Sequence, residues 1–258
     1  MKATCWIICL VLAPWLLAAQ PNPQSHLSVH EYSADKLSIS FPAEWVEIPR
    51  AELDQMSENV RKAAPNARPQ PYNYGFQASA KSQYPRVLVQ VKTSGRWSEK
   101  AIADMPKISS TTVETQARVS ALSPSFAALN LQIGKLTYDP GRHLVWMTFQ
   151  MTDGDGESLQ GLSGLHPTNV GSIQVHCYSL KAEFDRYAPL FSEIITSVQI
   201  GDELKYRARG SLMQSLGGAF DLRSMALDGA VGGIVAVVVV GFLRRRKTAA
   251  SKAQPPSS

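Results

Sequence analysis

Hydrophobic and polar residues alternate along several short segments of the chain. The alternation is clear over residues 36–41, 86–92 and 172–180, and a shorter segment of the same kind covers 74–78. A period of two residues is typical of a strand with one buried face, so these segments predict four strands. The apolar residues that set the period are Leu37, Ile39, Phe41, Val87, Val89, Val91, Ile173, Val175 and Cys177.

Helical spacing of apolar residues appears in two other segments. Leu53, Met56 and Val60 predict a helix over 51–64, which prolines follow from Pro65 onward. A second stripe predicts a final helix over 183–197, and it consists of Phe184, Tyr187, Phe191, Ile194 and Ile195. A shorter helix is expected between Ser98, a good N-cap residue, and Pro106.

A hairpin is predicted between these helices. Residues 131–138 and 143–152 have strand character, and four residues rich in turn formers, from Asp139 to Arg142, join them. The stretch 109–122 is ambiguous between helix and strand, and 153–171 is predicted to be a long flexible loop. Strands in meander-like order with helices at either end predict an α+β domain over residues 31–200, with a mainly antiparallel sheet flanked by helices.

The amino-terminal segment has the three parts of a secretory signal peptide. Lys2 supplies a positive start, an apolar core follows, and small residues up to Ala19 offer a cleavage site. The sequence therefore predicts a signal peptide over 1–19 and a disordered entry segment over 20–30. The alternative, an uncleaved amino-terminal anchor, is disfavoured because the apolar core is shorter than the roughly 20 residues that span a bilayer.

A second apolar run lies near the carboxyl end. It runs from Gly229 to Leu243 and stops at a cluster of four cations, 244–247. We predict a juxtamembrane segment (201–223), a transmembrane helix (224–243) and a basic cytoplasmic tail (244–258), with residues 20–225 exported. The alternative is a buried core helix. Gly229 and Gly233 form a GxxxG spacing that allows close helix approach in a homodimer.

Charge is concentrated in these ends. The chain carries 26 basic and 21 acidic residues, and six of the basic ones belong to the leader and the tail. The rest of the chain is therefore close to neutral and has no electrostatic footprint for nucleic acid. The basic tail can attract anionic lipid head groups, so membrane lipid is an expected partner through the tail and the helix.

Few residues offer chemistry. Cys177 is the one cysteine outside the leader, and a lone cysteine in an apolar strand is most often a small buried hydrophobe. Ser163 lacks the G-x-S-x-G spacing of a nucleophile elbow. His26 and His30 lie four residues apart but in strand or loop sequence, without other metal ligands nearby. The run Asp153 to Glu157 lacks the Gly and Glu positions of an EF-hand loop.

Aromatic residues raise the question of a contact surface. Trp45 and Trp146 lie in strand sequence and are expected in the core, whereas Trp97 follows Gly95-Arg96 and is the best candidate for an exposed contact. A binding surface is expected in the loop 153–171, near Trp97, or near Tyr84-Pro85.

The two ends of the predicted domain resemble a known superfamily. The segment from Leu37 to Trp45, a strand followed by Pro and Trp, resembles the start of Mog1/PsbP-like domains. The segment from Glu183 to Val198 is similar to the last helix of that superfamily, which runs into a short final strand. The resemblance implies a layered α+β fold and a mostly non-enzymatic superfamily, which includes a small-GTPase-binding protein, extrinsic photosystem II subunits and bacterial envelope proteins. It carries no catalytic residue over to this chain.

The expected function follows from these features. We expect a non-enzymatic single-pass membrane protein whose exported domain binds or supports an unknown membrane or envelope protein. We assign no catalytic, cofactor-binding or metal-binding residue and no cofactor. Two alternatives stay open: an enzyme of hydrolase type with an unrecognised site, and a domain whose carboxy-terminal anchor is cleaved during sorting.

Overall fold

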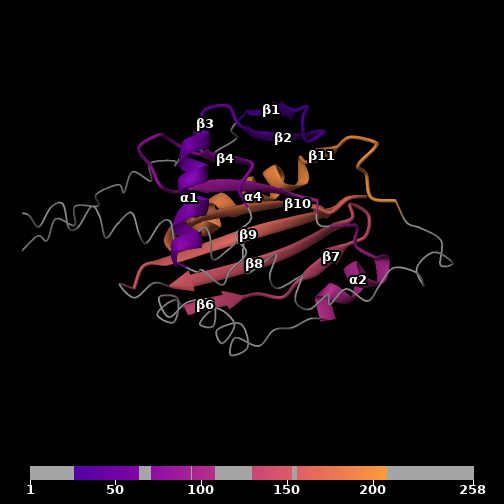
Figure 1. The fold of residues 1–258 in the computed structure, drawn as a ribbon. Coiled ribbons are helices and arrows are strands. Elements are labelled where there is room, and N and C mark those ends of the chain that lie inside the picture. The colour runs from indigo at the N-terminus through magenta and orange to yellow at the C-terminus, as the bar shows by residue number, and fades with distance from the viewer. Residues whose placement is uncertain (1–25, 64–70, 94, 108–129, 153–155, 208–258) are drawn as a thin grey trace, which may run out of the picture.

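The computed structural model describes residues 26–63, 71–93, 95–107, 130–152 and 156–207. Within these ranges the chain forms two antiparallel sheets and a small number of helices (Figure 1). No helix in them is long and apolar enough to cross a membrane. The predicted leader, the anchor with Gly229 and Gly233, the basic tail and the ambiguous stretch 109–122 lie outside the described residues.

The larger sheet has eight strands in the described part of the chain. Their order is β3-β4-β5-β10-β9-β8-β6, and β7 also pairs with β8. All of these pairings are antiparallel. The strands are β3 (Val46–Glu47), β4 (Tyr74–Gln77), β5 (Arg86–Lys92), β6 (Asn130–Ile133), β7 (Thr137–Asp139), β8 (Leu144–Thr152), β9 (Ser158–Pro167) and β10 (Ser172–Leu180).

The smaller sheet joins the two ends of the domain. It consists of β1 (Leu27–Tyr32), β2 (Leu37–Pro42) and β11 (Gln199–Ile200), with β2 in the middle. Strand β1 pairs with β2 along its whole length, so regular structure begins earlier than the predicted domain start at residue 31. The short β11 after the last helix is the final strand that the superfamily resemblance implies.

The main core lies between helix α4 (Phe184–Thr196) and one face of the large sheet. Helix α4 lies over β9 and β10 and next to β2 of the small sheet (Figure 1). Phe191 and Ile194 are fully buried there against Val175 and Cys177 of β10. The apolar stripe predicted over 183–197 is therefore the face that α4 turns to the sheet, and this prediction is confirmed.

The opposite face of the large sheet is covered by two other helices. Helix α1 (Arg50–Ala63) packs Leu53 close to Gly75 and Leu88, and Gly75 leaves the space that this approach needs. Helix α2 (Glu99–Asp104) is followed by a 3-10 turn, η1 (Met105–Lys107). The Ser98 hydroxyl accepts a hydrogen bond from the backbone N–H of Ala101 at 3.1 Å, which confirms the predicted N-cap.

Most predicted strands and helices are confirmed, and two further differences concern the hairpin and the loop after it. The first arm of the predicted hairpin is split into β6 and β7, because residues 134–136 lie opposite only residues 147–148 of β8, an extra residue that interrupts the ladder. The second difference is larger. The prediction of a flexible loop over 153–171 is wrong, because Ser158–Pro167 forms β9, a ten-residue strand between β8 and β10.

Candidate functional site

Strand β9 brings a serine and a histidine together on the face that α1 and α2 cover. Ser163 on β9 lies opposite His176 on β10, and Ser163 Oγ is 2.9 Å from His176 Nδ1. Both side chains are at least 96% buried, with exposed fractions of 4% and 1%. The sequence did not reveal this pair because the pairing depends on the strand 158–167, which was predicted as a loop.

The surroundings of His176 oppose catalysis by this pair. Burial lowers the pKa of His176 to about 3, and the positive charge of Lys92 acts in the same direction. A serine nucleophile needs a histidine that becomes a cation in the transition state and a group that stabilises that cation. Among the described residues, His176 Nε2 has no hydrogen-bond partner, so no carboxylate supports it.

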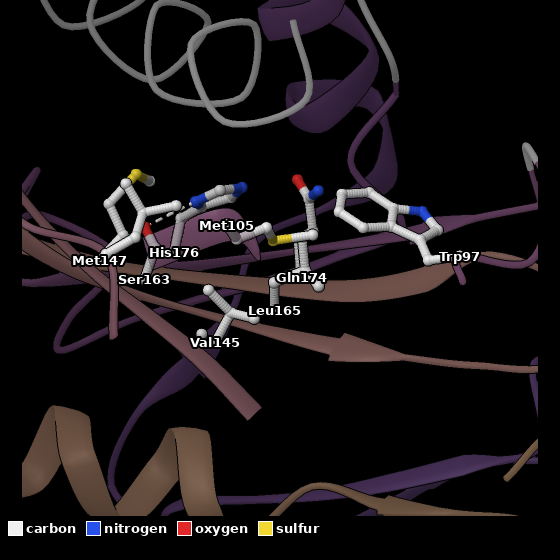
Figure 2. A pocket seen from close by; sticks show the side chains of 10 residues that line it. Trp97, Met105, Val145, Met147, Ser163, Leu165, Gln174 and His176 are labelled. Carbon is white, nitrogen blue, oxygen red and sulfur yellow. Dashed lines mark hydrogen bonds between the residues drawn. The ribbon is translucent and has the colours of Figure 1, made fainter. Parts of the chain in front are cut away.

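A small cavity lies next to this pair (Figure 2). Its volume is about 30 Å³, whereas ligand sites are typically about 300–1,000 Å³, so it does not admit a metabolite-sized substrate as it stands. Most of its wall is apolar. The lining residues are Trp97, Met105, Leu136, Val145, Met147, Ser163, Gly164, Leu165, Gln174 and His176.

A much larger open groove lies where the two sheets meet at one end of the domain. Its volume is about 430 Å³, within the usual range for ligand sites. It is lined by the turn before β8, the end of β9, the strand β11 with the residue before it, and the chain after β11. The lining residues are Arg142, His143, His166, Pro167, Val198, Gln199, Ile200, Lys205 and Tyr206.

The groove carries two exposed cations, each beside an acidic neighbour in sequence. Arg142 pairs with Asp139 at 2.9 Å, and Lys205 pairs with Asp202 at 2.5 Å. The arginine and lysine side chains are 64% and 57% exposed, so both remain in contact with solvent. Exposed pairs of this kind contribute little to stability, so a ligand carboxylate can compete for either cation.

Three polar or aromatic groups shape the rest of the groove. The ring of His143 lies 3.0 Å from the Tyr138 hydroxyl, and its backbone has φ of 48° after the predicted turn. Tyr206 donates its hydroxyl hydrogen to the carbonyl oxygen of Trp97 at 3.0 Å. His166 lies at the base, 3.0 Å from the Ile195 carbonyl, and burial lowers its pKa to about 4. His166 is therefore neutral at physiological pH.

The structure also places the candidates that the sequence singled out. Trp97 is buried with 6% exposure, so its predicted role as an exposed contact is wrong. Trp45 is buried and Trp146 is partly buried against the same core, as predicted. Cys177 is fully buried and burial raises its thiol pKa well above the usual value, which confirms the buried-hydrophobe prediction.

The predicted metal candidates do not converge in the described structure. The ring of His30 packs edge-on against Phe41 and Phe76 of the core. Within the described residues, no group of three or more His, Cys, Asp or Glu side chains could hold a metal ion. Residues 153–155 of the acidic run lie outside the described ranges, so the prediction that this run is not an EF-hand loop is not tested by the structure.

Comparisons with known proteins give a similarity of fold. No family profile matches the chain, and no curated protein sequence matches it. Among solved structures, it is similar to the solution structure of cyanobacterial PsbP (CyanoP) from Synechocystis sp. PCC 6803, with 14% identity and a TM-score of 0.44. The match covers 72% of this chain and 98% of the cyanobacterial one. A similarity at this level assigns neither a family nor a function.

Proposed function

We propose that this chain is a non-enzymatic, membrane-tethered exported domain that binds another protein through the open groove. The observation that carries the proposal is the groove itself, which is large, open and lined by two exposed cations from different segments. The Ser163–His176 pair, by contrast, is buried beside a cavity of about 30 Å³ and has no supporting carboxylate among the described residues.

The lining of the groove favours a protein segment with acidic and apolar side chains. Pro167, Val198 and Ile200 provide an apolar floor, while Arg142 and Lys205 provide charge. An arginine can bind a carboxylate through two parallel hydrogen bonds, which adds geometric specificity. We therefore expect the partner to place an aspartate or glutamate over the groove and an apolar side chain on its floor.

The position of the groove along the chain fits a partner at the membrane. Lys205 and Tyr206 line the groove, and the described chain ends at residue 207. Residues 208–223 connect this point to the predicted membrane helix. Sixteen residues span at most about 55 Å when fully extended, so the groove stays within that distance of the bilayer. Membrane and envelope proteins are therefore the expected partners.

The proposal is tested by co-purification from native membranes with and without groove charge. Arg142→Glu combined with Lys205→Glu should lower recovery of the partner about tenfold, since each exposed charge pair contributes about 0.2–1 kcal/mol and reversal adds repulsion. Lys81→Glu changes an exposed lysine outside the groove and should leave recovery unchanged. Equal loss in all variants, or no loss in any, would argue against the groove.

A hydrolase is the second candidate, and the Ser163–His176 hydrogen bond of 2.9 Å is the observation in its favour. Its test is labelling of the full chain with a fluorophosphonate, which modifies activated serines. The non-enzymatic proposal predicts no labelling at Ser163. Labelling that disappears in Ser163→Ala would establish the hydrolase instead. Intact mass of the same sample would show whether the predicted anchor is retained or cleaved.

A further inference from the structure

Buried polar side chains lie on the face of the large sheet opposite α4. On the side covered by α1 and α2, the neighbouring strands β5, β10 and β9 present Gln90, Gln174, His176 and Ser163. Each of these side chains has an exposed fraction of 4% or less. Apolar residues of similar size would fill the same space without desolvating polar atoms, so this group has a physical cost that needs an explanation.

Two atoms of this group have unused hydrogen-bonding capacity. Gln174 Oε1 and His176 Nε2 are buried, and neither has a hydrogen-bond partner among the described residues. A buried polar atom without a hydrogen-bond partner destabilises the folded state. Gln174 and His176 are two residues apart on β10 and point to the same face. Figure 2 shows the second ring nitrogen of His176 turned toward the side where the Gln174 amide lies.

The small cavity lies over these two atoms, since both residues line it. Its volume of about 30 Å³ exceeds the roughly 10–15 Å³ that a water needs but is far below the cavity of about 150 Å³ that holds benzene. We propose that this cavity is a binding site for one small neutral molecule, water in the resting protein, that bridges His176 Nε2 and Gln174 Oε1. A cation is disfavoured there by the nearby positive charge of Lys92.

The donors and acceptors around the cavity give this bridge a direction. The Gln174 amide oxygen can only accept, so the bound water must donate a hydrogen to it. Among the described residues, the Ser163 hydroxyl has no hydrogen-bond partner other than His176 Nδ1, so it donates its hydrogen there over 2.9 Å. Nε2 is then the protonated nitrogen, and it donates to a lone pair of the water. The site therefore fixes one tautomer of a neutral histidine.

The inference is tested by nitrogen NMR of the full chain in lipid nanodiscs with labelled histidine. His176 is assigned from the signal that disappears in His176→Gln. Its Nε2 should have the chemical shift of a protonated nitrogen, Nδ1 that of an unprotonated one, and the Nε2 hydrogen should show a cross-peak to a slowly exchanging water. A protonated Nδ1 in the wild-type chain, or a protonated Nε2 without any contact to water, would overturn the proposal without the need for a variant.

Two variants separate the water bridge from the serine contact. Gln174→Leu removes the group that accepts from the water, so the water contact should be lost while the Ser163 hydroxyl keeps Nε2 protonated. Ser163→Ala removes the donor to Nδ1 but leaves the bridge, so both tautomers should appear and the water contact should persist. A water contact that survives Gln174→Leu, or that disappears in Ser163→Ala, would exclude the bridge.

Discussion

Gly164 sets how closely α4 can pack on the large sheet. A methyl group placed on Gly164 would lie 2.2 Å from Cγ2 of Ile195, far inside van der Waals contact. Ile195 is fully buried on α4, and the same methyl would also lie 3.2 Å from Leu144. Gly164→Ala must therefore displace α4 or strain Ile195. Overpacking of this kind costs about 1–3 kcal/mol, which lowers Tm by roughly 2–4 °C per kcal/mol in a domain of this size.

The contact itself is tested by a double-mutant cycle in urea denaturation. Ile195→Ala alone should cost about 2–5 kcal/mol because it leaves a cavity. In the double variant the new methyl of residue 164 fills part of that space, so the loss should be smaller than the sum of the single losses by at least about 1 kcal/mol. Additivity within about 0.5 kcal/mol would refute the argument, since it would mean that the two positions do not touch.

Three further predictions follow from buried groups. Burial lowers the pKa of His166 and His176, so the folded state binds fewer protons than the unfolded state between about pH 4 and 6.5. Each histidine should therefore lower the free energy of unfolding by about 2–3 kcal/mol as pH falls through this range. Urea denaturation at pH 4 and 7 measures this loss, and an equal free energy of unfolding at both pH values would contradict it. Burial also lowers the pKa of Lys92 to about 8, so stability should rise by about 1–2 kcal/mol from pH 7.5 to 9.5, and Lys92→Met should remove this rise. The Cys177 thiol should react with iodoacetamide only at the rate of unfolding, and rapid labelling of the native protein would show that β10 is accessible.

The part of the fold that the sequence predicts is the part with one clean apolar period. In β2, the alternation of Leu37, Ile39 and Phe41 with serines matches the observed burial, because one face of this strand meets α4 and the other stays partly exposed. The α4 stripe is equally clear, since one face of the helix meets the sheet and the other meets solvent. Local chemistry also sufficed for the Ser98 cap and for the turn at Asp139, whose carboxylate accepts backbone N–H groups of Gly141 and Arg142.

Strand β9 could not be predicted because both of its faces are covered and several of its side chains are small. Gly161 faces Phe149 of β8, where a methyl group would lie 2.2 Å from the ring, and Gly164 faces Ile195. Large neighbours thus supply the apolar volume, and β9 itself has the glycine-rich composition of a loop. The local sequence of β9 contains no information on Phe149 and Ile195, the distant residues against which these glycines pack.

The groove could not be predicted from the sequence for the same reason, because its residues come from distant segments. Arg142 is predicted in a turn, and Lys205 lies in a segment assigned to the membrane-proximal linker. Nothing in their sequence spacing indicates that they line one surface. They come together because residues 168 and 205 form an antiparallel bridge, which carries the chain after β11 back toward the end of β9. Of the predicted binding positions, Trp97 is wrong as an exposed contact because it is buried, whereas the segment 153–171 contributes His166 and Pro167 to the groove. The candidate at Tyr84-Pro85 stays a prediction.

The central claim, that the groove receives another protein, is tested most directly by a photo-crosslinking amino acid at Gln199. This residue is exposed and lines the groove, and the same amino acid at Lys81 provides a control outside it. Irradiation of native membranes should give one discrete adduct from position 199, weakened by Arg142→Glu, and none of that mass from position 81. The same adduct from both positions, or none from position 199, would contradict the account.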